Sequence, residues 1–87
     1  MKIEFRNSFV KDLKRIDTPA KQQVKQLIDQ IEKAQSFSSL ENIKKLKGTE
    51  NYYRIRLGDY RVGVILDRET LIFVRFLHRK DIYRYFP

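Results

Sequence analysis

The sequence predicts an α+β domain in which two helices cover one face of an antiparallel sheet. Two observations favour this class. Apolar residues recur at helical spacing over residues 7–34, whereas apolar and polar residues alternate from Asn51 onward. Hydrophobic residues make up 41% of the chain, and it has only three glycines and two prolines, a composition typical of a globular protein. With 87 residues, we expect one domain over residues 1–87.

The N-terminal segment predicts a short strand and a first helix. In "KIEF", residues 2–5, polar and apolar residues alternate as they do in a strand. Asn7 or Ser8 is expected to cap the helix that follows, because a short polar side chain accepts hydrogen bonds from the first free N–H groups. The helix is expected to carry one apolar face, made of Phe9, Val10, Leu13 and Ile16.

A second helix is predicted after the break "DTPA", residues 17–20. Thr18 is the expected N-cap, and Pro19 suits the first helical position, where its missing N–H costs nothing. Two short helices joined by a tight break predict an antiparallel hairpin. The segment "SFSSLEN", residues 36–42, is expected to be a linker into the basic "IKKLKG". The apolar face of the second helix consists of Val24, Leu27, Ile28, Ile31 and Ala34.

Three strands of an antiparallel meander are predicted next, and the first two are joined by Gly58-Asp59. A two-residue loop with Gly at its first position is a common hairpin connection. It makes Leu57 face Tyr60, Arg56 face Arg61 and Arg54 face Gly63. The core face of this hairpin is expected to hold Tyr53, Ile55, Leu57, Tyr60, Val62, Val64 and Leu66.

The opposite face of the hairpin is expected to bind an anion. Like charges directly opposite each other destabilise a sheet, so the facing pair Arg56 and Arg61 calls for a compensating ligand. Guanidinium groups hold phosphate oxygens by paired, charge-assisted hydrogen bonds. Gly63 is expected to leave space beside Arg54 for a ligand to approach the backbone. The alternative is a solvent-exposed sheet face that is rich in arginine but binds no ligand.

The third strand, "TLIFVRFL", is expected after a three-residue loop over residues 67–69. This loop would put Arg75 beside Arg61, and Ile72, Val74 and Phe76 on the core face. A four-residue loop would bury Arg75 unpaired, at a cost of several kcal/mol. A last helical turn is predicted in the tail, residues 78–87.

Net charge points to a polyanionic partner. Residues 1–43 carry eight Lys/Arg against six Asp/Glu, and residues 44–87 carry eleven against five. A basic domain favours nucleic acid first among the polyanions, although charge also keeps small proteins in solution. With no cysteine and one histidine, the sequence predicts neither a metal nor another cofactor. The first ten residues lack a signal-peptide core and no run is long enough to span a membrane, so we expect a cytoplasmic location without a membrane partner.

The tail is expected to bring chemistry-bearing side chains to the end of the sheet. These are His78, Arg79, Tyr83 and Tyr85. Histidine titrates near neutral pH, and tyrosine can donate a proton or stack on a base. The alternatives are that His78 only satisfies a backbone carbonyl and that the tyrosines only pack.

The segments "KKLKG", "YYRIRLGDYRVGVIL" and "LHRKDIYRYF" together resemble the RelE/ParE superfamily of toxins from type II toxin–antitoxin modules. For the RelE branch, this resemblance implies an mRNA interferase that acts in the ribosomal A site without a metal. The ribose 2′-oxygen attacks the adjacent phosphate and leaves a 2′,3′-cyclic phosphate and a 5′-hydroxyl. The implied partners are mRNA, the ribosome with its rRNA, and a cognate antitoxin in a hetero-oligomer.

The resemblance also implies roles for individual residues. Family members often have lysines in the strand pair, but this chain has arginines, which stay protonated, so the general base is expected to be His78 or Tyr83. The catalytic set is Arg54, Arg56, Arg61, His78, Arg79 and Tyr83. The expected RNA contacts are Lys44, Lys45, Lys47, Arg75 and Lys80.

Two other functions fit the same sequence. The ParE branch shares the fold and inhibits DNA gyrase by binding, with no chemistry of its own, and "LHRKDIY" is also compatible with a tail of that branch. The third possibility is a basic RNA-binding homologue without activity. The coincidence of three strand arginines with His78 and Tyr83 favours the RelE branch.

Overall fold

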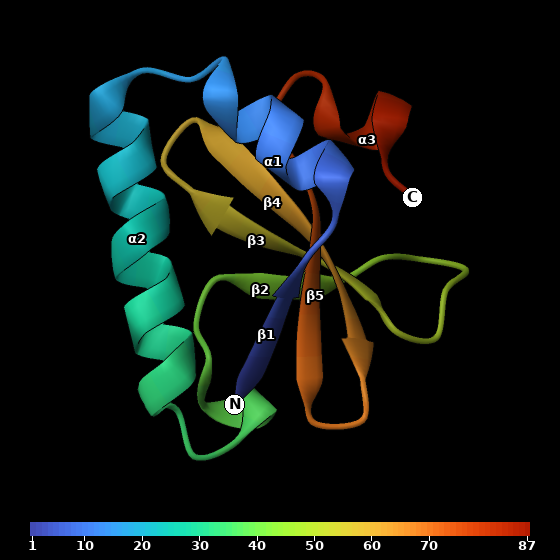
Figure 1. Ribbon diagram of the computed structural model, residues 1–87. Helices are drawn as coiled ribbons and strands as arrows, with labels where there is room; N and C mark the ends of the chain where they lie inside the picture. Colours follow the sequence, from blue (N-terminus) through green and yellow to red (C-terminus); the bar gives the residue numbers. More distant parts are fainter.

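A computed structural model describes all 87 residues as a five-stranded sheet with helices on both faces (Figure 1). The sheet order is β1-β5-β4-β3-β2, in which β1 runs parallel to β5 and the other neighbours are antiparallel. This is the predicted α+β class. No helix is both long and apolar enough to cross a membrane. The elements are β1 (Lys2–Phe5), α1 (Asn7–Lys14), α2 (Thr18–Lys33), the 3-10 turn η1 (Phe37–Ser39), β2 (Ile43–Lys45), β3 (Tyr52–Leu57), β4 (Tyr60–Asp67), β5 (Thr70–His78) and α3 (Ile82–Tyr85).

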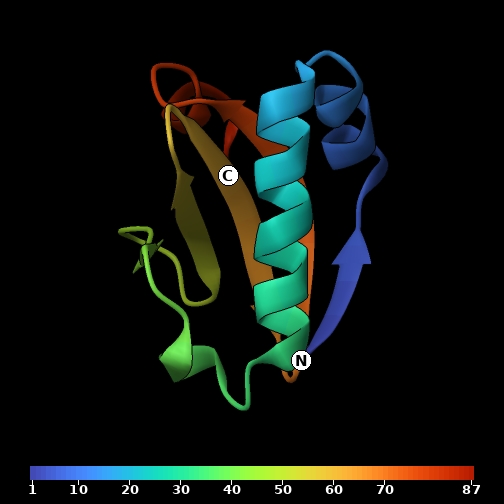
Figure 2. The same ribbon diagram turned by 90° about the vertical axis from the view of Figure 1, so that its left-hand side faces the viewer.

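The main core lies between the sheet and the two long helices. Figure 2 shows α2 running along one side of the sheet, with α1 beside its first turns. Within this core, the Phe9 ring of α1 packs against the rings of Phe73 and Phe76 on β5. Val10, predicted on the apolar face of α1, is exposed instead. The buried members of this core are Phe9, Ala20, Val24, Leu27, Ile31, Ile55, Val62, Val64, Leu71, Phe73 and Phe76.

Both helix starts differ from the prediction. The N-cap of α1 is Arg6, whose side chain makes no capping bond, and the Ser8 hydroxyl donates to the Val74 carbonyl on β5 instead. In α2 the N-cap is Asp17, whose carboxylate accepts a hydrogen bond from the Ala20 N–H at 3.2 Å. A carboxylate there also complements the positive end of the helix dipole, which a Thr18 hydroxyl cannot do.

The β3–β4 hairpin has the predicted register. Leu57 pairs with Tyr60, Arg56 with Arg61 and Arg54 with Gly63. Gly58 adopts a φ of 61°, the left-handed backbone that the first position of this loop requires.

The β4–β5 register corrects the prediction. The loop has two residues, because Asp67 pairs with Thr70, and Arg68 takes a positive φ of 57° within it. A register shift between Gly63 and Val64 then moves Arg75 opposite Gly63 rather than Arg61. A one-residue slip turns side chains to the other face, and a bulge turns them back. Leu71 and Phe73 therefore fill the main core in place of the predicted Ile72 and Val74, whereas Phe76 lies in this core as predicted.

One strand was missed altogether. β2 lies in the basic segment "IKKLKG", to which the sequence assigned no secondary structure, and it pairs Lys44 with Arg54 and Lys45 with Tyr53. Three residues give too little alternation to reveal a strand. The lysines of β2 blunt the free edge of the sheet.

The C-terminal turn packs on the sheet face opposite the main core. Ile82 and Phe86 are buried there against Leu46, which forms a second, smaller core. The Phe86 ring lies directly on Gly63, where a Cβ atom would come within 2.7 Å of it. The space at Gly63 that was predicted for a ligand is therefore filled by the protein's own tail.

Candidate nucleic-acid interface

A row of four cross-strand neighbours runs across the sheet face that carries α3. Lys44 pairs with Arg54, Arg54 with Gly63, and Gly63 with Arg75, so these four residues lie side by side across β2, β3, β4 and β5. Phe86 occupies the middle of the row, over Gly63. The tail therefore separates Arg54 from Arg75, and the two arginines have different surroundings.

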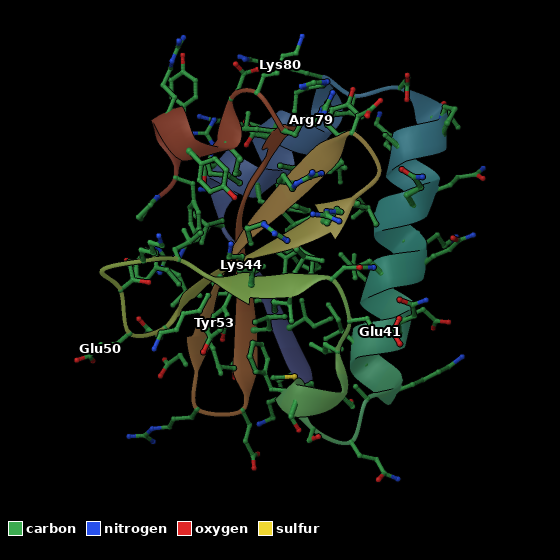
Figure 3. The ribbon with its side chains drawn as sticks, turned by 180° about the vertical axis from the view of Figure 1, so that it is seen from behind. Glu41, Lys44, Glu50, Tyr53, Arg79 and Lys80 are labelled. Carbon is green, nitrogen blue, oxygen red and sulfur yellow. The ribbon has the colours of Figure 1, made fainter.

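On the Arg54 side, five cations surround one pocket, called here the arginine pocket. Its volume is about 490 Å³. Figure 3 looks onto this face, with Lys44 near the centre of the sheet and Arg79 and Lys80 at its upper end beside α3. No carboxylate lines the pocket, so its positive charge is uncompensated within the chain, which suits a phosphate. The lining residues are Arg54, Arg56, Arg61, Arg79, Lys80 and Tyr83.

Neutral groups orient two of these arginines. Nε of Arg54 donates to the Tyr83 hydroxyl at 3.4 Å, and Nη1 of Arg54 donates to the Asn42 carbonyl at 3.2 Å. Nη1 of Arg61 donates to two carbonyls of its own hairpin, each at 2.8 Å. Because the acceptors carry no charge, the guanidinium groups are held in place while their charge stays available to a ligand.

The electrostatic cost of this arrangement is concentrated at Arg61. Desolvation by burial lowers the pKa of Arg61 from its usual value, and the positive charges of Arg56 and Arg54 lower it further. Repulsion of this kind is relieved when an anion binds between the cations. The register thus places Arg56 directly opposite Arg61, which is the source of part of this repulsion.

Arg75 lies outside the arginine pocket. Its Nε and Nη2 atoms donate to the two carboxylate oxygens of Asp12 at 2.7 and 3.1 Å, and its guanidinium lies 5.6 Å from the ring centre of Tyr85. The hydrogen bond to Asp12 is the main reason that the pKa of Arg75 is raised. Asp12, which is only 8% exposed, also accepts the Phe76 N–H at 3.0 Å. Arg75 was expected to contact RNA, but here it links α1 to β5 and α3.

The two expected general bases occupy different places. Tyr83 lines the arginine pocket, whereas His78 does not. The His78 ring packs edge-on against Tyr60, which belongs to the margin of the main core, and its Nδ1 accepts the Lys80 N–H at 3.2 Å. The tail therefore brings Arg79 and Tyr83 to the arginines, but not His78 or Tyr85.

A second pocket adjoins the first, and Tyr83 lines both. Its volume is about 360 Å³. It holds all three lysines that were expected to contact RNA near β2. Sequence reasoning missed its apolar part, which comes from the tail. We call it the lysine pocket, and its lining residues are Lys44, Lys45, Leu46, Lys47, Tyr83, Phe86 and Pro87.

The whole chain is similar to known toxins. The family described as "ParE toxin of type II toxin-antitoxin system, parDE" matches residues 3–83. The sequence is 47% identical to Toxin RelE3 of Methanocaldococcus jannaschii over 88 residues, which cover all of both chains.

Solved structures agree with this similarity. The RelB-RelE antitoxin-toxin complex from Methanococcus jannaschii matches with a TM-score of 0.82 and 44% identity, over 97% of this chain and 99% of that chain. The archaeal RelE-RelB complex from Pyrococcus horikoshii matches with a TM-score of 0.74 over 93% of this chain and 97% of that one. At 22% identity, the second match supports the fold alone.

Proposed function

Because the chain belongs to the RelE/ParE superfamily of toxins from type II toxin–antitoxin systems, we propose that its arginine pocket cleaves mRNA in the ribosomal A site. The RelE-like character of the toxin rests on its high identity to Toxin RelE3. The observation that carries the proposal is the arginine pocket itself, with five cations, one tyrosine and no carboxylate. We further propose that residues 1–87 act as one toxin domain in the cytoplasm.

The proposed reaction is an internal transfer at one phosphate. The ribose 2′-oxygen bonds to phosphorus as the bond from phosphorus to the 5′-oxygen breaks, which gives a 2′,3′-cyclic phosphate and a 5′-hydroxyl. The 2′-hydroxyl loses a proton, and the departing 5′-oxygen gains one. Negative charge builds on the phosphoryl oxygens between these events. Fixed positive charges beside these oxygens are usually the largest single contribution to the stabilisation of such a transition state.

The residues divide these tasks. Arg56 and Arg61 face each other and hold the phosphoryl oxygens, and Arg54, two residues before Arg56 on β3, supports them. Tyr83 is the one neutral side chain in the pocket that carries a transferable proton, and we assign it proton transfer at a reacting oxygen. The pocket's own cations supply the positive charge that a metal would supply, so the proposal includes no metal.

An antitoxin is the proposed protein partner. The solved relative from Methanococcus jannaschii is a complex of the toxin with its antitoxin RelB. The net charge of +8 and the uncompensated arginine pocket favour an acidic, partly disordered antitoxin that folds on binding. Charge reversal at Arg56 weakens such a complex if the antitoxin covers the pocket, and unchanged affinity assigns the antitoxin to another surface.

The ParE name of the matching family supports a second candidate, inhibition of DNA gyrase by binding alone. One experiment separates the two. Expression without a partner should arrest growth, and primer extension on translated messages should then reveal cuts within codons, while gyrase supercoiling in the same cells stays normal. Lost supercoiling without cut messages supports gyrase inhibition. Normal growth at high soluble expression contradicts both toxin functions.

A further inference from the structure

We propose that Arg75 is a positioning residue for the proposed cleavage, which acts through Tyr85 to keep Tyr83 in the arginine pocket. The inference deepens the proposed function and rests on it. Arg75 lines no part of that pocket. It fixes the rotation of α3 about the helix axis and thereby directs the Tyr83 hydroxyl toward Arg54.

The turn α3 is attached to three neighbouring strands through one row of cross-strand neighbours. On β3, Arg54 donates a hydrogen bond to the Tyr83 hydroxyl. On β5, the Arg75 guanidinium lies 5.6 Å from the ring centre of Tyr85. Between these two contacts, the Phe86 ring covers the glycine of β4. Because neighbouring strands lie about 4.8 Å apart, the two outer contacts are separated by roughly 10 Å.

Tyr83 and Tyr85 leave α3 on opposite sides. Two residues apart in a helix correspond to a rotation of about 200° around its axis. When the Tyr85 ring lies on β5, the Tyr83 side chain therefore points the other way, toward β3. The buried residues Ile82 and Phe86 lie four apart, in a single line along the helix about which it can still roll. A helix of four residues has little stability of its own, so its rotation depends on the outer contacts.

Asp12 makes Arg75 a rigid support for this contact. It accepts hydrogen bonds from Nε and Nη2 of Arg75, and it is itself held by the Phe76 N–H. A bidentate pair fixes the plane of the guanidinium as well as its position, which leaves the face of that plane for an aromatic ring. The bond between Arg54 and Tyr83, by contrast, is exposed and 3.4 Å long, so it is the weaker of the two outer contacts.

The test removes the Tyr85 ring, which is exposed, so that its loss leaves the core intact. In the full-length protein, Tyr85→Ala should lower the single-turnover cleavage rate by about 2–5-fold, the factor that an exposed cation–π contact represents. Ribosome affinity should not change. Tyr85→Phe should cleave at the wild-type rate, because it keeps the ring. The matched control is Arg84→Ala, which should also cleave at the wild-type rate, since Arg84 is exposed on the same helix and lies outside the arginine pocket.

Two further measurements distinguish positioning from a purely structural role. In a Tyr83→Phe background the hydroxyl to be positioned is absent, so Tyr85→Ala should lower the rate no further. By NMR, nuclear Overhauser contacts between the Tyr83 ring and the Arg54 side chain should weaken in Tyr85→Ala and remain in Tyr85→Phe. Contacts between Phe86 and Gly63 should remain in both variants, because the Phe86 ring is buried.

Arg75→Lys tests the support itself. Lysine keeps the positive charge but lacks the planar group that binds Asp12 at two points and lies against Tyr85. We expect Arg75→Lys to weaken the NMR contacts of Tyr83 as Tyr85→Ala does. Combining the two substitutions should weaken these contacts no further, because both act on the same interaction.

The outcomes separate this inference from the proposed function. A wild-type rate in Tyr85→Ala, an equal loss in the Tyr83→Phe background, or a detached Phe86 overturns the positioning role and leaves cleavage intact. If the wild type never cuts mRNA on the ribosome, the proposed function fails. The NMR contacts between Tyr83 and Arg54 then decide alone whether Arg75 positions Tyr83.

Discussion

At the scale of single residues, the site depends on which side chains the strands place together and which they separate. Arg56 and Arg61 were paired from sequence alone, because the Gly58-Asp59 loop fixes the count outward along both strands. The fate of Arg75 could not be predicted in this way, because its partner Asp12 lies 63 residues earlier in the chain. Cross-strand neighbours follow from local rules, and ion pairs between distant elements do not.

Arg61 is the first residue for which a quantitative outcome follows. Arg61→Ala should lower the single-turnover cleavage rate by a factor of about 10²–10³, because the transition state loses one positive charge that stabilises its phosphoryl oxygens. Ribosome binding should change little. Thermal stability should hold or rise, since Arg61 is repelled by Arg56 and Arg54. The measurements are cleavage of an A-site codon at saturating toxin, ribosome affinity and thermal melting. If the folded Arg61→Ala variant cleaves at the wild-type rate, Arg56 and Arg61 do not act as a catalytic phosphate-binding pair.

Tyr83 and His78 provide the second residue-scale prediction. Tyr83→Phe keeps the ring and should lower the cleavage rate on the order of 10²-fold, the low end of proton-transfer contributions. His78→Gln should stay within a few-fold of the wild type with an unchanged pH profile, because His78 packs on Tyr60 outside the arginine pocket. Rates measured across pH 5–9 for both variants decide the matter. The reverse pattern, with a pH limb lost in His78→Gln, would reassign the base to His78.

At the scale of elements, the predictable parts are those with strong local patterns. The hairpin of β3 and β4 followed from alternation and its turn, and α2 followed from helical spacing. The register of β5 did not, because a two-residue loop and a bulge each move it by one residue and neither has a distinctive sequence. The docking of α3 was also missed, because Gly63 alone does not reveal which distant ring will cover it. That docking decides where Tyr83 lies.

Gly63 is thus the sheet position whose missing side chain allows the C-terminal tail to dock. Gly63→Ala would put a Cβ atom 2.7 Å from the Phe86 ring, so either the ring or the strand must move. We expect a loss of about 1–3 kcal/mol of unfolding free energy, typical of overpacking, and a larger fractional loss of cleavage as α3 shifts Tyr83. Urea unfolding and single-turnover cleavage measure the two effects.

A double-mutant cycle with Phe86 tests the cause. Phe86→Ala removes the clash, so Gly63→Ala should cost almost nothing further in that background. Additive costs in the two backgrounds would mean that Gly63 acts through the strand alone and not through the tail.

Asp12 holds α1 against the second half of β5, which extends beyond its pairing with β1. It binds the Arg75 guanidinium and the Phe76 N–H, both of which lose their partner in Asp12→Ala. The variant should lose about 3–5 kcal/mol, the cost of breaking a largely buried pair. Asp29→Ala is the matched control, because Asp29 is 64% exposed and pairs with Lys33 on the surface of α2 at 3.1 Å, a contact of about 0.5 kcal/mol or less. Urea unfolding measures the loss of unfolding free energy in each variant. Similar losses in the two would mean that Asp12 stabilises the fold no more than an exposed carboxylate does.

At the scale of the whole molecule, the net charge of +8 is structured rather than spread evenly. The helices carry charges of both signs, whereas the arginine pocket gathers five cations with no carboxylate. The second half of the chain was already recognisable as the basic half from sequence. The gathering of five cations at one pocket could not be predicted without the fold, because β3, β4, the turn after β5 and α3 all contribute side chains to it.

This focus predicts a specific linkage between anions and stability. Sulfate or phosphate bound in the arginine pocket stabilises the folded state by RT ln(1 + [L]/Kd), which is about 2.7 kcal/mol at one hundred times Kd. For a chain of this size, each kcal/mol raises Tm by roughly 4–8 °C. Sodium sulfate should therefore raise Tm well above sodium chloride at the same ionic strength, and Arg61→Ala should lose most of the difference. A Lys21→Ala variant, which removes one exposed charge from α2, should keep it. Equal increases in sulfate and chloride, or an unchanged difference in Arg61→Ala, would mean that general screening of the net charge is responsible, because a bound anion must depend on the arginines that hold it.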